Sequence, residues 1–227
     1  MKTLFNLRNT KPLLVILSVS ALFAVCLSSC KKDNNSAVGV TAYVMAVNSA
    51  QASSPQDFYV DNNKLNESAI AYTQNTEYLA VNGGSHNVQF KTSGTTTVNG
   101  TSSASFMPGT YNSIYFTDDG SATTTQDDRT QPQSGKARVR FINVSSAVTG
   151  NVDFGLSTGN KIVTGLANKA ASTYYEVDAA TSFSLYASGS ATAMLSIPTT
   201  IQAGHIYTIY ISGATTATLT YHIIAQS

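Results

Sequence analysis

The sequence contains very little cysteine: only Cys26 and Cys30 occur among its 227 residues, and both lie near the N-terminus. Beyond Cys30 the chain has no thiol that could form a disulfide or act as a nucleophile. Tryptophan is absent and there are only five prolines. The 197 residues that follow Cys30 are enough to stabilise a fold through burial of apolar surface alone.

Charged residues are also scarce, at 11% of the sequence, and they form no basic cluster. All twelve acidic residues follow Cys30, whereas Lys2, Arg8 and Lys11 precede it. The part of the chain after Cys30 therefore holds ten basic and twelve acidic residues, for a net charge near −2. Because nucleic-acid binding calls for a clustered basic surface, we expect no nucleic-acid partner.

The residue types that carry catalysis are few. None of the three histidines, His86, His205 and His222, stands in a nucleophile-elbow or metal-ligand arrangement with a serine or an acid. The acidic pairs at 118–119 and 127–128 lack the alternating acidic pattern of a calcium loop, so we interpret them as part of a solvated connector. We expect no catalytic residue, no metal and no cofactor, and hence a protein that is not an enzyme.

The N-terminal segment has the parts of an export signal. A basic beginning is followed by an apolar stretch at residues 13–27, whose 15 residues fall short of the roughly 20 that span a bilayer. The stretch ends in Leu27-Ser28-Ser29-Cys30, which resembles a bacterial lipobox. We expect a signal peptide over residues 1–29, cleavage between Ser29 and Cys30, and lipidation of the Cys30 sulfur. The alternative is an ordinary secretory signal with an incidental cysteine.

Lipidation would attach the protein to a membrane, because each buried acyl methylene contributes about 0.8 kcal/mol and two or more chains make a stable anchor. Residues 30–38 would then be the lipidated cysteine and a flexible polar tether, which resembles the tethers of lipoproteins from the Bacteroidota. Lys31 stands where an inner-membrane retention signal of other bacteria would place Asp. We therefore expect a lipid-anchored protein of the cell envelope, at the outer membrane, on its periplasmic face or at the cell surface.

The rest of the chain repeats itself at an offset of 95 to 96 residues. Residues 42–48 align with residues 137–143, and the register holds through five segments to the end of the unit. This indicates two copies of one domain, at residues 39–126 and 136–227, joined by a linker at residues 127–135. Three matched pairs recur at fixed places in the copies: Asn48 and Asn143, Asp57 and Asp153, and Gly109 and Gly204.

Each copy is predicted to be a β-sandwich. Thr, Val, Ile and Tyr are abundant, and short alternating runs are separated by turn residues. The turns at Gly109 and Gly204 are expected to precede the penultimate or last core strand, and residues 82–85 are expected to form a hairpin turn. The predicted fold is all-β, with two tandem immunoglobulin-like or transthyretin-like antiparallel β-sandwiches after the signal peptide and tether.

Comparison of the copies predicts which side chains point inward. The face of Ala42, Val44 and Ala46 is apolar in both copies and is expected to be buried. The opposite face holds Tyr43 and Met45 in one copy and Arg138 and Arg140 in the other, so we expect it to contact water. The same alternation places Tyr115 and Tyr210 outside.

The matched polar residues are interpreted as structural. Asn48 and Asn143 end their strands, where Asn side chains commonly hydrogen-bond to the backbone of a turn. Recurrence of Asp57 and Asp153 favours a structural hydrogen bond in each copy over a catalytic pair split across two domains. We expect Arg138 or Arg140 to be the partner of Asp153.

Residues 136–145, 151–154 and 204–210 together resemble the family called domain of unknown function 4397. The first copy resembles a more diverged member, through Val47-Asn48-Ser49 and residues 57–61. The resemblance implies immunoglobulin-like or transthyretin-like sandwiches in an extracytoplasmic protein, and it brings no catalytic residues. Its motifs are strand and turn motifs, so it informs on the fold and hardly at all on activity.

The sequence thus predicts a non-catalytic envelope lipoprotein that acts as a structural, adhesive or interaction module with an unknown protein or glycan partner. One alternative is a surface carbohydrate-binding lipoprotein associated with polysaccharide uptake, which would need several co-planar exposed tyrosines. The tyrosines considered for this role are Tyr43, Tyr72, Tyr115, Tyr174, Tyr186 and Tyr210. Another alternative is a fimbria-like fibre subunit that pairs through the uncharged C-terminal run at residues 217–225.

Overall fold

The computed structural model describes residues 40–148 and 150–226. The predicted signal peptide, the cleavage site at Ser29, the lipidation site at Cys30 and the tether all lie outside the described residues. Gly39–Ser227 forms one compact unit. Within the described ranges, no helix is long and apolar enough to cross a membrane.

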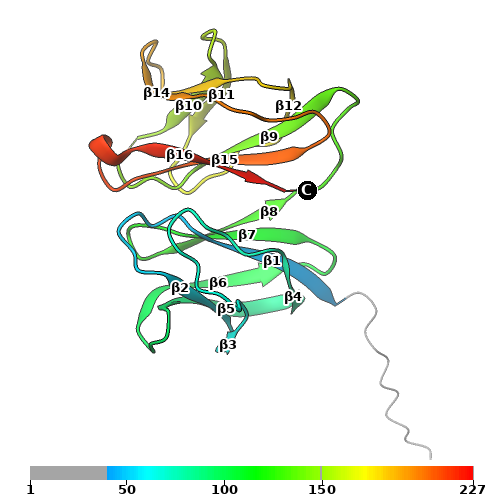
Figure 1. Ribbon diagram of the computed structural model, residues 1–227, viewed down its shortest axis with the longest axis vertical. Helices are drawn as coiled ribbons and strands as arrows, with labels where there is room; N and C mark the ends of the chain where they lie inside the picture. Colours follow the sequence, from blue (N-terminus) through cyan, green and yellow to red (C-terminus); the bar gives the residue numbers. More distant parts are fainter. Residues whose placement is uncertain (1–39, 149, 227) are drawn as a thin grey trace, which may run out of the picture. The chain divides into compact units, whose positions relative to one another are not determined.

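The first sandwich is built from eight strands: β1 (Thr41–Asn48), β2 (Gln56–Val60), β3 (Asn63–Lys64), β4 (Leu79–Asn82), β5 (Gly84–Thr92), β6 (Val98–Phe106), β7 (Tyr111–Phe116) and β8 (Ala122–Asp127). They form two four-stranded sheets with the orders β4-β1-β7-β8 and β3-β2-β5-β6. Figure 1 shows β1 and β7 in one layer and β2, β5 and β6 in the other.

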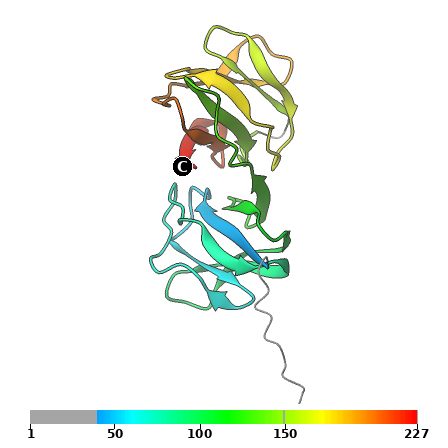
Figure 2. The same ribbon diagram turned by 90° about the vertical axis from the view of Figure 1, so that its right-hand side faces the viewer.

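The second sandwich repeats this plan with β9 (Lys136–Asn143), β10 (Val152–Leu156), β11 (Lys161–Leu166), β12 (Tyr175–Asp178), β13 (Phe183–Ala187), β14 (Ala193–Ile197), β15 (Ile206–Ser212) and β16 (Thr220–Ala225). A short 3₁₀ helix, Thr216–Thr218, precedes β16. The two sheets have the orders β12-β9-β15-β16 and β11-β10-β13-β14, and Figure 2 shows them as two layers.

The prediction of an all-β fold made of sandwiches is confirmed, with one difference in strand direction. β1 pairs with β7 in parallel, and β9 pairs with β15 in parallel, so one sheet of each sandwich is mixed. Antiparallel pairing is required only of strands joined by tight turns, and five other strands separate β1 from β7 along the chain.

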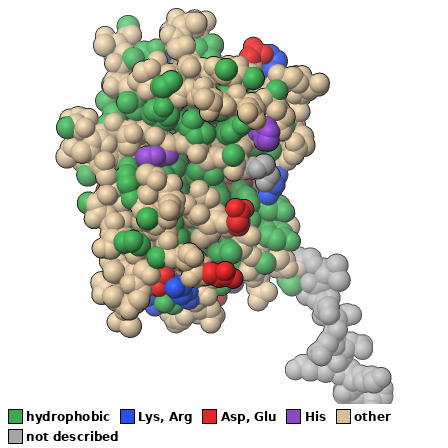
Figure 3. Space-filling view, viewed as in Figure 1, with side chains coloured by type: hydrophobic (Ala, Val, Ile, Leu, Met, Phe, Trp, Pro, Cys, Tyr) green, Lys and Arg blue, Asp and Glu red, His purple; other side chains and the backbone are tan. Residues whose placement is uncertain are grey.

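The inward face predicted from the two copies is confirmed. Ala42, Val44 and Ala46 have no exposed surface, and neither do their counterparts in β9. Each sandwich encloses its own apolar core, because period-two alternation sends one side of every sheet inward. Charged side chains are few and scattered on the face shown in Figure 3.

The hairpin predicted at residues 82–85 is wrong. β4 pairs with β1, whereas β5 pairs with β2 and β6, so these residues lead from one sheet to the other. Close packing explains Gly83 here, since a Cβ atom on it would lie only 2.7 Å from Cγ of Pro108. A local Asn-Gly signal indicates that the chain reverses, but the packing of the sheets decides which strand it joins.

The prediction that the opposite face contacts water is wrong for most of its residues, although Tyr43 and Arg138 are only half-buried. Met45 and Arg140 are 3% and 1% exposed, and Tyr115 and Tyr210 are completely buried. The face of β1 and β7 packs against the face of β9 and β15 instead. Apolar residues from both sandwiches form one shared cluster there: Met45, Val47, Tyr115, Ile142, Val144, Tyr210 and Ile224.

The C-terminal run considered as a pairing edge is largely covered. β16 is an edge strand, yet only Ala225 among its residues is exposed. Its residue His222 lies against Tyr72 of the first sandwich, with the Tyr72 hydroxyl 3.1 Å from Nε2. This strand therefore offers little of its side-chain surface to another copy.

Candidate functional site

Asp57 and Asp153 occupy equivalent places and make equivalent contacts. Asp57 is 3% exposed and accepts hydrogen bonds from Lys64 Nζ at 2.9 Å and from the N–H of Gly94 at 3.2 Å. Asp153 is 2% exposed and accepts hydrogen bonds from Lys161 Nζ at 2.8 Å and from the N–H of Gly189 at 3.0 Å. Each carboxylate thereby holds the turn of a hairpin in its own sheet, β5–β6 in the first sandwich and β13–β14 in the second.

These contacts explain the acidity of both carboxyl groups. Burial alone would raise the pKa of Asp57, but hydrogen bonds from Lys64, Gly94 and a serine hydroxyl hold that pKa below its usual value. The pKa of Asp153 is lowered in the same way, against the effect of burial. The arginine partner predicted for Asp153 is wrong, because Arg138 and Arg140 lie on β9, in the other sheet, and pair with Asp128 and Asp127.

Asn48 and Asn143 are both fully buried at the ends of β1 and β9. The Asn48 side-chain oxygen accepts the N–H of Ala50 at 3.2 Å, and that of Asn143 accepts the N–H of Ser145 at 3.3 Å. Both are local turn contacts made to the backbone two residues on. Both asparagine side chains therefore stabilise the turn that follows their strand, as predicted from the sequence.

Gly109 and Gly204 lie in equivalent turns before β7 and β15. Both have positive φ, 79° and 84°, a conformation that glycine adopts without steric cost. The N–H of Gly109 donates to the carbonyl of Thr41 at 2.7 Å, and the N–H of Gly204 donates to the carbonyl of Lys136 at 2.8 Å. These bonds tie each turn to the start of the first strand of its sandwich.

The most buried charges lie between the two sandwiches. Arg140 of β9 forms an ion pair with Asp127 of β8, and the two side chains are 1% and 0% exposed. Arg140 also donates to the Thr208 hydroxyl at 2.9 Å and to the carbonyl of Gln126 at 2.8 Å. A charge this deep is tolerated only when it is paired and hydrogen-bonded, so these contacts are structural.

The same network continues through tyrosines of both copies. The second oxygen of Asp127 accepts hydrogen bonds from the hydroxyls of Tyr78 and Ser113, both at 2.6 Å. Gln226 donates to the Tyr78 hydroxyl at 3.2 Å and accepts from the Tyr174 hydroxyl at 2.8 Å. The residues involved are far apart in the sequence, and no local pattern indicates their contact.

The histidines have partners that sequence spacing did not suggest. His86 Nδ1 lies 2.7 Å from a carboxylate oxygen of Asp61. His222 Nε2 lies 3.1 Å from the Ser212 hydroxyl, and burial lowers the pKa of His222. Ser212 has no exposed surface, so its hydroxyl does not face a substrate-accessible space. Among the described residues, no three His, Cys, Asp or Glu side chains are grouped as metal ligands.

The six tyrosines named for the carbohydrate-binding alternative, which would need several exposed and co-planar rings, are all buried or half-buried. Tyr43 and Tyr111 stack on each other with centroids 4.7 Å apart, and Tyr78 meets Tyr111 edge-on at 87°. Tyr115 and Tyr210 are buried between the sandwiches. Tyr174, one of the tyrosines named from the sequence, lines a polar cleft beside Arg138 and Arg140. Tyr175, which sequence reasoning did not single out, lines a more apolar cleft.

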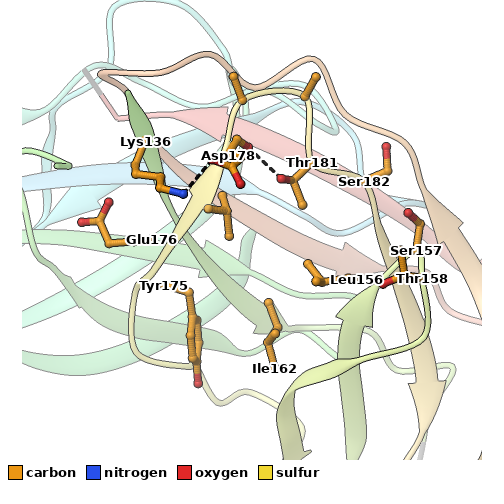
Figure 4. Close-up of a pocket in the computed structure, with 13 residues that line it drawn as sticks. Lys136, Leu156, Ser157, Thr158, Ile162, Tyr175, Glu176, Asp178, Thr181 and Ser182 are labelled. Atoms are coloured by element: carbon orange, nitrogen blue, oxygen red, sulfur yellow. Dashed lines mark hydrogen bonds and ion pairs between the residues drawn. The ribbon is translucent and has the colours of Figure 1, made fainter. Parts of the chain in front are cut away.

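That cleft lies in the second sandwich, between the edge strands β11 and β12, and has a volume of about 570 Å³. Its apolar lining comes from Leu156, Ile162 and Val177. Figure 4 shows Tyr175 beside Ile162, with Lys136 and Asp178 on another side. Lys136 Nζ lies 2.7 Å from Asp178, and the two side chains are 40% and 77% exposed. The cleft thus combines an aromatic ring, an apolar floor and an exposed ion pair.

The first sandwich has a cleft at the equivalent place, with a volume of about 300 Å³. Val60, Leu65 and Val81 line it, and these residues match Leu156, Ile162 and Val177 of the second sandwich. The floor of the cleft is therefore apolar in both copies. Sequence reasoning missed both clefts, because each forms where the two sheets of a sandwich separate.

The chain has no match among curated proteins. Among solved structures it is similar to a carbohydrate-binding module of family CBM26 from Eubacterium rectale, determined in complex with maltoheptaose. The two are 12% identical, the alignment covers 80% of this chain and 96% of that chain, and the TM-score is 0.29. A likeness at this level carries no conclusion about ligand or activity.

A family model described as domain of unknown function DUF4397 matches residues 42–155. The match begins in β1, covers the first sandwich and ends in β10 of the second. One copy of the family is thus found where the internal repeat had predicted two. With half of its length matched, the chain belongs to the DUF4397 family.

Proposed function

We propose that the protein is a non-catalytic module of the cell envelope, anchored to a membrane through a lipid on Cys30, which acts by structural or adhesive contact with a partner. The observation that carries this proposal is the buried network between the sandwiches. Arg140 and Asp127 form a buried ion pair in this network, and Asp57 and Asp153 accept hydrogen bonds from hairpin turns. These polar residues thus stabilise the turns of each sandwich and the contact between the two sandwiches.

The two clefts support a binding role over a catalytic one. Their apolar floors match position by position, but their polar rims differ between the copies. A catalytic set present before a duplication would be expected to leave the same polar groups in at least one shared position. A difference at the rim over a common floor is what divergent binding surfaces would show.

Three finer points belong to the same proposal. The constant offset of the repeat and the equivalent contacts of Asp57 and Asp153 support two copies of the DUF4397 unit, the first more diverged. The lipobox-like Leu27-Ser28-Ser29-Cys30 supports lipidation, and Lys31 supports sorting to the outer membrane. The polar residues after Cys30 support a tether of the Bacteroidota type.

Membrane fractionation tests the anchor. Cys30→Ala is expected to move the protein from the membrane fraction to the soluble fraction, because it removes the acylated sulfur. Cys26→Ala is the matched control, since this cysteine lies inside the apolar stretch and should leave fractionation unchanged. Unchanged membrane association of Cys30→Ala would refute the anchor. Turnover in a broad hydrolase panel, abolished by one point substitution, would refute the non-catalytic role.

A further inference from the structure

The clefts of the two sandwiches differ at four matched positions on β9 and β12 and their counterparts. The register of the ladders makes the match unambiguous, since Thr41 pairs with Asn82 in the first copy as Lys136 pairs with Asp178 in the second. At these two matched positions the second copy has the charged residues Lys136 and Asp178, and the first copy has the neutral residues Thr41 and Asn82. The remaining two differences are Glu176 for Ala80 and Tyr175 for Leu79.

The second cleft therefore presents a particular combination of groups. Tyr175 supplies a half-buried aromatic ring next to the apolar side chains of Ile162 and Leu156. Lys136 and Asp178 supply a charged donor and acceptor at the rim, whereas Glu176 points away from Tyr175 and pairs with Arg138. Hydroxyl side chains complete the polar part of the lining: Ser157, Thr158, Thr181 and Ser182.

A saccharide matches this combination. A pyranose ring has an apolar face of C–H groups, which packs on an aromatic ring, and hydroxyls around its edge, which hydrogen-bond to carboxylates and ammonium groups. The cleft volume of about 570 Å³ falls within the range of small-ligand sites. An apolar peptide would use the floor, but it would leave the exposed charges of Lys136 and Asp178 without a role.

We propose that the cleft between β11 and β12 of the second sandwich binds a saccharide, with Tyr175 as the stacking surface and Lys136 and Asp178 as hydrogen-bonding partners at the rim. The first cleft does not bind it, because no tyrosine lines that cleft and Thr41 and Asn82 replace Lys136 and Asp178; the ionisable groups in its lining are Asp61 and His86, which contact each other. This inference rests on the proposed role as an interaction module and names the class of its ligand.

The test uses residues 31–227, because Gly39–Ser227 is a compact unit with its own cores. The protein is applied to an array of dextran, laminarin, xylan, mannan, galactan and polygalacturonate, and bound polysaccharides are titrated by calorimetry. Tyr175→Leu introduces the residue that the first copy has at this position. The rim variant, Lys136→Thr with Asp178→Asn, does the same for the charges, so both variants are expected to fold.

Each variant is expected to weaken binding about tenfold or more, because stacking and charge-assisted hydrogen bonds each contribute on the order of that factor. Tyr59→Leu is the matched control: Tyr59 is a half-buried tyrosine on β2, outside both clefts, and its substitution should leave binding unchanged.

Three results would overturn the proposal. They are the absence of binding to every polysaccharide, unchanged binding by both cleft variants, and equal loss in Tyr59→Leu. Binding of an apolar peptide at the cleft, without any polysaccharide binding, would assign the cleft to a peptide instead. Membrane fractionation of the full-length chain carrying the same substitutions is expected to stay unchanged, because Cys30 is intact, so failure of the saccharide proposal is distinguishable from failure of the lipid anchor.

Discussion

Removal of the Asp127 carboxylate is expected to destabilise the protein strongly. Asp127→Ala leaves the guanidinium of Arg140, which is 1% exposed, in the interface without its counter-charge. Loss of one partner of a buried ion pair costs about 3–5 kcal/mol of unfolding free energy. For a chain of this size 1 kcal/mol corresponds to about 2–4 °C, so the melting temperature should fall by roughly 6–20 °C.

Urea unfolding of residues 31–227, followed by circular dichroism, measures this change. The control is the double variant Arg140→Met with Asp127→Leu, in which the methionine copies Met45, the counterpart of Arg140 in β1. Replacing both charges leaves the hydroxyls of Tyr78 and Ser113 without their acceptor, and the Thr208 hydroxyl and the Gln126 carbonyl without the Arg140 donor. Since apolar replacement of both partners of a buried ion pair is often nearly neutral, the double variant should lie within about 1–2 kcal/mol of the parent.

The two results together decide the point. A cost below about 1 kcal/mol for Asp127→Ala would show that the pair is not buried as described. A double variant as unstable as the sum of the two single variants would show that the charges do not interact, because coupled residues give non-additive effects.

Further predictions concern the buried tyrosines and the response to acid. The hydroxyls of Tyr115 and Tyr210 have no hydrogen-bond partner among the described residues. Tyr115→Phe and Tyr210→Phe should therefore leave the unfolding free energy unchanged or raise it by up to about 1 kcal/mol, as measured by urea unfolding. A clear loss of stability would show that the hydroxyl has a partner. Asp57 and Asp153 have lowered pKa values in the folded state, so their stabilising effect is complete above the unfolded-state value of about 3.9 and is lost as the pH falls below it. Denaturation curves from pH 7 to pH 2 should therefore show a smaller loss of stability in Asp57→Asn and Asp153→Asn than in the parent; identical pH dependence would contradict this account.

Local sequence pattern was sufficient for the inward faces and for the turns. Ala42, Val44 and Ala46 alternate with polar or variable residues, and a strand with this alternation must put one set on the core side. Gly109 and Gly204 were predictable for the same local reason, since their turns need a positive φ that glycine tolerates.

The partners of charged residues were not predictable in the same way. Asp153 was expected to pair with an arginine of β9, but it pairs with Lys161, which lies on the adjacent strand of its own sheet. The first copy contains the equivalent pair of Asp57 and Lys64, and alignment of the two lysines is the signal that could have found it. Tyr175 had no such signal, because its importance comes from the cleft that surrounds it.

The sequence by itself determined that this protein is made of repeated β-sandwiches, because alternation, turn residues and a constant offset are properties of the chain. Only the tertiary structure decided what the outer face contacts in the two sheets that contain β1 and β9. Period-two alternation separates two faces but does not say whether the outer one contacts water or another sheet, and Arg140 is compatible with both. Its burial depends on Asp127 lying opposite, which is a property of how the two sandwiches pack.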